Sequence, residues 1–77
     1  MDEAFKYYKQ ALKLNQRIGS LIGETNQLGN IGLFYLNKGE LNEALKHLKR
    51  AERIATKIEY VDGIKRTKEL INLIKVK

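Results

Sequence analysis

The stretch that decides the fold is residues 28–51, LGNIGLFYLNKGELNEALKHLKRA. Apolar side chains recur through it in steps of three and four, the spacing that places them on one side of an α-helix. The pattern breaks at Lys38 and Gly39, where a basic residue precedes the residue best suited to a left-handed helix C-terminus. The stretch therefore predicts two helices joined by a tight turn, which have to lie antiparallel.

The same pattern extends over the whole chain and nearly repeats every 40 residues. The recurring pairs are Ala4/Ala44, Phe5/Leu45, Lys6/Lys46, Tyr8/Leu48, Ala11/Ala51, Leu14/Ile54, Ile18/Ile58 and Gly23/Gly63. A fixed period between 20 and 50 residues is typical of stacked structural units, none of which buries its apolar face alone. We predict four helices, over about residues 2–18, 20–38 and 41–58 and from Tyr60 or Val61 onward.

The apolar spacing also predicts which side chains face inward. On the second helix, the inner face is predicted to contain Leu21, Thr25, Leu28, Ile31, Gly32 and Tyr35. The fourth helix carries a wider apolar arc, made of Ile64, Leu70, Ile71, Leu73, Ile74 and Val76. An arc of this width is what we expect of a helix that also serves in self-assembly.

Composition excludes several classes of protein. The chain has 77 residues and no cysteine, so it is at most one small domain without a disulfide or a thiolate metal site. Its hydrophobic residues, 43% of the total, are well spread, which predicts order. No apolar run approaches the ~20 residues of a membrane span, and the first residues do not resemble a signal peptide. We expect a soluble, cytoplasmic protein.

Catalysis finds little support in the residues. The single histidine, His47, lies within the predicted third helix, one turn from Glu43, and a pairing of that kind is usually a solvated helix contact. There is no cysteine or second histidine to build a metal site, and no phosphate-binding loop or dinucleotide fingerprint. We therefore expect no enzyme activity, no cofactor and no bound metal.

Nine positions in the deciding stretch agree with a known family in residue type and spacing. They are Leu28, Ile31, Gly32, Tyr35, Gly39, Leu41, Ala44, Leu48 and Ala51. At this spacing the stretch resembles the tetratricopeptide repeat (TPR), in its longer variety with 40 residues per repeat. The resemblance implies an all-α fold in which antiparallel helix hairpins stack as a right-handed α-solenoid, here with four helices. It also implies that Gly32 and Ala44 lie where paired helices cross closely.

The resemblance further implies one domain, residues 1–77, that is out of register with the repeat unit. Residues 1–19 match the second half of a repeat, residues 20–59 a full repeat, and residues 60–77 a first half or capping helix. The first helix then lacks its preceding partner and the last helix its following one. We expect these end faces to meet in a homodimer or a head-to-tail oligomer. Alternatively, the chain is a fragment of a longer array.

In this family the first helix of each pair lines a concave groove that holds a protein segment. The resemblance places two sets of residues on that face: Asn26, Asn30, Leu33, Leu36 and Asn37 of the second helix, and Arg66, Leu70 and Leu73 of the fourth. An asparagine side chain can pair with a peptide backbone through both donor and acceptor. The resemblance thus implies a non-catalytic scaffold that binds a peptide or partner helix.

Two other functions stay open. In the first, the protein is a purely structural, self-assembling module, with the end faces or groove leucines as its interface. In the second, a basic helical domain binds nucleic acid, since the net charge is +6. Its candidate residues are Lys46, Lys49, Arg50, Arg53, Lys57, Lys65, Arg66 and Lys68. Glutamates interleave with these residues, which disfavours a phosphate-tracking stripe, and no membrane partner is expected.

Overall fold

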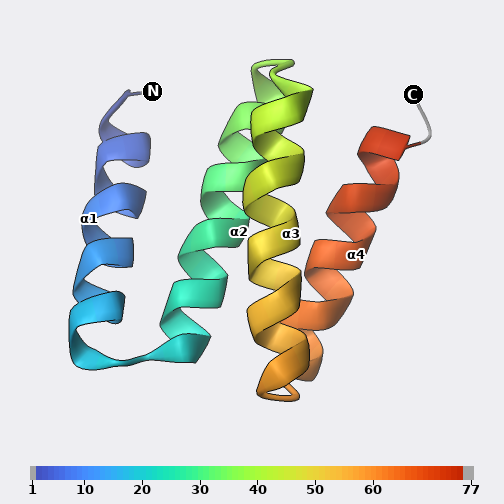
Figure 1. Ribbon diagram of the computed structural model, residues 1–77. Helices are drawn as coiled ribbons and strands as arrows, with labels where there is room; N and C mark the ends of the chain where they lie inside the picture. The colour runs from blue at the N-terminus through green and yellow to red at the C-terminus, as the bar shows by residue number, and fades with distance from the viewer. Residues whose placement is uncertain (1, 76–77) are drawn as a thin grey trace.

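The computed structural model describes residues 2–75, and these residues form four helices. In chain order they are α1 (Asp2–Ile18), α2 (Leu21–Asn37), α3 (Leu41–Lys57) and α4 (Val61–Lys75). The helices alternate in direction, and α3 lies in front of α2 with α1 and α4 on either side (Figure 1). The predicted all-α fold of stacked antiparallel helices is confirmed, with helix ends within about two residues of those predicted. No helix in this part of the chain is long and apolar enough to cross a membrane.

The three turns share one geometry and lie 20 residues apart. In each, one residue takes a left-handed conformation: Gly19 (φ 76°), Gly39 (φ 80°) and Glu59 (φ 58°). The amide of the next residue then donates to the carbonyl five residues earlier, in the pairs Ser20–Asn15 (2.8 Å), Glu40–Tyr35 (2.9 Å) and Tyr60–Ala55 (2.9 Å). This arrangement satisfies carbonyls that a helix end leaves unpaired. It sets each helix antiparallel to the one before.

The core lies between α2 and α3, where the repeat signature residues meet. Leu28, Ala44, Leu48 and Ala51 are fully buried. Gly32 faces Leu48 so closely that an added Cβ would lie 2.6 Å from the leucine Cδ2 atom. The prediction that small residues mark the helix crossing is therefore confirmed, because only a glycine lets α2 approach Leu48 this closely.

Helix α1 packs on α2 through aromatic side chains. The Phe5 ring stacks on Phe34 with 4.5 Å between centroids and meets Tyr35 edge-on at 5.6 Å. Tyr35 is half-buried and also lies against the His47 ring, at 5.4 Å. Of the four helices, α2 alone packs against α1. Helix α1 is thus a peripheral element.

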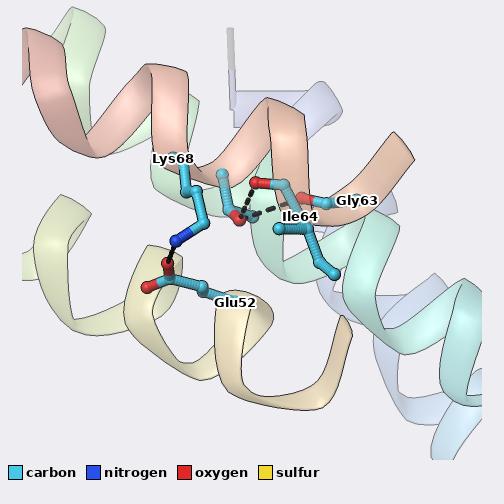
Figure 2. Close-up of polar contacts among 5 residues, drawn as sticks. Glu52, Gly63, Ile64 and Lys68 are labelled. Atoms are coloured by element: carbon cyan, nitrogen blue, oxygen red, sulfur yellow. Dashed lines mark hydrogen bonds and ion pairs between the residues drawn. The ribbon is translucent and has the colours of Figure 1, made fainter. Parts of the chain in front are cut away.

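Helix α4 packs on both α3 and α2. The close-up in Figure 2 shows the Lys68 ammonium 3.2 Å from a Glu52 carboxylate oxygen, which joins α4 to α3. The buried Thr67 hydroxyl donates within its own helix and lies 2.9 Å from the Gly63 carbonyl and 3.1 Å from that of Ile64. Gly63 leaves room for the Tyr60 ring. The helix is therefore held by packing, and its buried polar group is satisfied.

One position of the predicted inner faces is wrong. Leu21, predicted on the inner face of α2, is 42% exposed because it begins the helix at the open end of the α1–α2 turn. On α4, Ile71 is only 5% exposed and belongs to the core, whereas Leu73 is 55% exposed. The wide arc of this helix is thus partly core. Val76, the last member of that arc, lies outside the described residues.

Candidate interaction surface

The predicted groove residues of α2 follow one another along one side of the helix. Asn26, Asn30, Leu33 and Asn37 are spaced by four, three and four residues, which puts them on one face. The first three are partly exposed, and Asn37, the last residue of the helix, is exposed. Leu36 is partly exposed at the border of this face. The face therefore combines amide groups with apolar surface that solvent reaches.

Polar bonds bring α4 against this face. The Arg66 guanidinium donates through Nη2 to Asn30 Oδ1 at 2.7 Å, and the Tyr60 hydroxyl donates to Asn26 Oδ1 at 3.1 Å. The Asn30 amide nitrogen also lies 3.3 Å from Gln27 Oε1. The Tyr60–Asn26 and Arg66–Asn30 bonds connect residues 34 and 36 positions apart in sequence. Three of the predicted groove residues are thus brought together where α2 meets α4.

Gly29, which the family resemblance also places on this face of α2, makes room for this arrangement. A Cβ added to Gly29 would lie 3.1 Å from Arg66 Nη1. The guanidinium therefore lies against bare α2 backbone, with its remaining N–H groups available for another acceptor. The signal was present in the sequence as Gly29-Asn30-Ile31-Gly32, but only the need for Gly32 follows from the repeat pattern.

The predicted groove residues of α4 form a shorter row. Arg66, Leu70 and Leu73 are spaced by four and three residues and share one face of the helix. Arg66 and Leu70 are partly exposed, and Leu73 is more exposed than either. Arg66 alone of the three is bonded to a groove residue of α2. The two leucines extend the apolar part of the surface beyond it.

The His47 side chain is hydrogen-bonded within its own helix. Its Nδ1 atom is 2.8 Å from the Glu43 carbonyl oxygen, a bond that requires the proton on Nδ1. The Glu43 carboxylate is farther away, at 4.0 Å. Within residues 2–75, no three His, Cys, Asp or Glu side chains gather as a metal site would need. The side chains around His47 thus serve packing.

Exposed apolar side chains gather at the other end of the molecule, which the sequence analysis did not foresee in this form. Among the described residues, seven large apolar side chains are exposed: Tyr7, Leu14, Ile18, Leu21, Ile22, Val61 and Leu73. The first five belong to α1 and the start of α2. An apolar patch of this kind marks an interaction surface.

One acidic residue lies among the basic residues of α3. Lys46, Lys49, Arg53 and Lys57 are exposed along the helix, and Glu52 lies among them. Glu52 in turn pairs with Lys68 of α4. Interleaved carboxylates weaken the attraction of such a face for a phosphate backbone. This arrangement disfavours nucleic-acid binding relative to protein binding.

Together, these features define a helical-repeat protein. A comparison with protein families gives the particular family: the model of the tetratricopeptide repeat matches residues 1–18 and 28–57, more than half of the chain. The chain belongs to the tetratricopeptide repeat family, whose repeats mediate protein–protein interactions and typically act as scaffolds without catalytic activity. Searches of curated proteins and of solved structures returned no match.

Proposed function

We propose that this protein is a non-catalytic scaffold that holds a peptide or partner helix along the groove formed by α2 and α4. The bond from Arg66 to Asn30 carries this proposal, because it fixes a cation and an amide between apolar side chains of two different helices. Charged hydrogen-bond donors beside apolar surface provide orientation and affinity in the same site. No chemistry beyond binding is required of these residues.

We also infer that the chain is one domain, residues 1–77, built on a 40-residue repeat: a half repeat over 1–19, a full repeat over 20–59 and a half repeat over 60–77. The three turns at 20-residue intervals support this division. The offset gives α2 and α4 the same role, as first helices of their repeats. Their shared role is why we assign the groove to these two helices.

The groove chemistry predicts the kind of segment that binds. Arg66 retains N–H donors for a carboxylate or a backbone carbonyl, and the amides of Asn26 and Asn30 retain capacity for a peptide backbone. Leu33 and Leu70, both partly exposed, offer apolar contact on either side. We therefore expect an extended or helical segment with apolar side chains and one acidic or carbonyl group. We do not propose a carboxylate clamp, because Leu70 stands where the family's clamp arginine is expected.

The experiment selects binding peptides from a random display library on the full chain and measures their affinities by fluorescence anisotropy. We expect Leu33→Glu and Asn30→Ala to weaken binding by at least tenfold while circular dichroism shows unchanged helicity. Asn42→Ala, an exposed asparagine on α3, is the matched control and should bind as the unaltered chain does. If the selected peptides bind both groove variants normally, the groove assignment is wrong.

A second function is favoured by a separate observation. Five of the seven exposed large apolar side chains lie on α1 and at the start of α2, where no other described helix covers them. We propose that the protein also self-associates through an end face. Self-association and groove binding use different surfaces, so they are compatible in one molecule.

A further inference from the structure

One side of α1 packs against α2, and another side carries a second row of apolar residues. Phe5 and Leu12 lie on the side toward α2, where Phe5 stacks on Phe34. Another row, Ala4, Tyr7, Ala11, Leu14 and Ile18, follows the spacing three, four, three, four along the helix. Its large members are 63%, 54% and 65% exposed at Tyr7, Leu14 and Ile18. This row, the α1 stripe, has the heptad spacing by which two helices pack against each other.

The outer end of α4 is not a suitable partner for the α1 stripe. Forty residues after Leu28 and Gly32, which pack against α3, α4 carries Lys68 and Asn72. Both are exposed, and Lys68 is already paired with Glu52 at 3.2 Å (Figure 2). A head-to-tail stack would bury this ion pair and an amide against apolar side chains, which costs free energy unless each group finds a partner. The two ends therefore do not match each other.

The α1 stripe does match itself. At its centre is Ala11, a small residue that allows a second helix to approach closely. Beside the stripe, Glu3 and Arg17 lie on the same flank, fourteen residues apart, and both are exposed. An antiparallel second copy of α1 places Glu3 of each chain opposite Arg17 of the other. In a parallel copy this flank faces the other flank of the partner helix, which carries Tyr8 and Asn15, so no charge pair forms.

The lysines of α1 do not oppose this pairing. Lys6, Lys9 and Lys13 are spaced by three and four residues. Lys9 and Lys13 lie on the far side of the helix from the stripe, and Lys6 lies between Arg17 and Lys13 around the helix. Lys9 is held on the far side, with its ammonium 5.1 Å above the Phe5 ring. The chain has a net charge of +6, yet the charges nearest the stripe are one acidic and one basic. Electrostatics at this face thus favour a second copy.

We propose that two copies of the chain pair through their α1 stripes, antiparallel and related by a two-fold axis near Ala11. This inference rests on the proposed self-association and specifies its surface, its symmetry and its charge pairs. Two helices of 17 residues overlap along about 25 Å at a rise of ~1.5 Å per residue. An interface of that length is at the small end of specific interfaces, so the dimer forms in a concentration-dependent manner. Both grooves stay open.

The test is sedimentation equilibrium of the full chain over a wide concentration range, with two variants that make the same change. Leu14→Glu charges the stripe, and Leu73→Glu charges a leucine of nearly equal exposure on α4, 55% against 54%. We expect a dimer whose dissociation constant rises at least tenfold in Leu14→Glu and stays within about twofold in Leu73→Glu. Circular dichroism confirms that both variants remain helical.

Charge reversal tests the orientation. Glu3→Arg and Arg17→Glu should each weaken the dimer severalfold, and the double variant should restore it, because the opposite charges then face each other again. In a parallel dimer Glu3 and Arg17 face uncharged side chains, so each single reversal would leave the dissociation constant nearly unchanged. No loss in either single variant overturns the antiparallel arrangement.

The outcomes separate this inference from the self-association on which it rests. If the chain is monomeric at every concentration, the proposed self-association is wrong. A dimer that tolerates Leu14→Glu keeps self-association but overturns the α1 interface. Open-ended species that grow with concentration identify a head-to-tail stack instead.

Discussion

At the residue scale, Gly29 and Gly32 lie one turn apart on α2 and differ in the neighbours that an added Cβ would meet. A Cβ at Gly32 would lie 2.6 Å from Leu48 Cδ2 and 3.4 Å from the Ala44 carbonyl, so the tightly packed α3 would have to move. At Gly29 the nearest atom is Arg66 Nη1, at 3.1 Å, the far end of a flexible side chain. The same substitution therefore probes a packed core at one site and a movable group at the other.

We expect Gly32→Ala to lower the free energy of unfolding by about 1–3 kcal/mol through overpacking. Gly29→Ala is the matched control: it should raise that free energy by up to about 1 kcal/mol, since alanine favours helix and Arg66 can move aside. Urea denaturation followed by circular dichroism measures both. Equal effects at the two positions would contradict the packing described for the α2–α3 crossing.

At the element scale, the turn after α3 differs from the other two turns in the residue that takes positive φ. Gly19 and Gly39 take positive φ at no steric cost, whereas Glu59 takes φ 58° with a side chain that disfavours it. We expect Glu59→Gly to raise the free energy of unfolding by up to about 1 kcal/mol. Gly39→Glu makes the reverse change at the equivalent turn, in open space, and should lower it by a similar amount. Thermal unfolding checks both, and a loss in Glu59→Gly would show that this side chain stabilises its turn.

Helix existence and the main core could be predicted from the sequence because they depend on local spacing. Leu28, Ala44 and Leu48 are buried as the repeat signature predicted, since each needs only its own helix and the next one. The faces at the two ends were less predictable, because burial there depends on which neighbours are present. Leu21 shows this error: it was predicted to face inward and is exposed at the start of its helix.

The candidate surface could be predicted only in part. The resemblance placed Asn30 and Arg66 on one face, but nothing local in the sequence indicates that they bond across 36 positions. That contact depends on the position of α4 along the axis of α2, and side-chain packing determines this position. The α1 stripe was not predicted, because its exposure depends on α2 packing against the other side of the helix.

At the scale of the whole molecule, net charge opposes compaction. The chain carries +6 at pH 7, and the described side chains include few ion pairs, such as Lys68–Glu52 and Lys38–Glu40. Repulsion among exposed cations is screened over about 10 Å at 0.1 M salt. We expect sodium chloride, raised from low to moderate concentration, to increase the free energy of unfolding by up to about 1 kcal/mol. Urea titrations at each salt concentration measure this.

The control for this effect is a chain of lower charge. Lys13→Gln combined with Lys46→Gln removes two exposed cations from different helices and leaves a net charge of +4 by subtraction from +6. The increase with salt should shrink in this variant. A stability that falls with salt in the unaltered chain would mean that favourable ion pairs outweigh the repulsion.

The pattern of helix contacts described above has a consequence for how the chain reaches its structure. Each helix touches the next along the chain, and the most distant contact joins α2 to α4. Such a topology has low contact order. No long loop has to close before stabilising contacts form, so folding is fast. The α2–α3 hairpin holds the tightest packing and is the natural nucleus, onto which α4 docks from one side. Helix α1, which rests on α2 alone, completes the structure last and is the first to open.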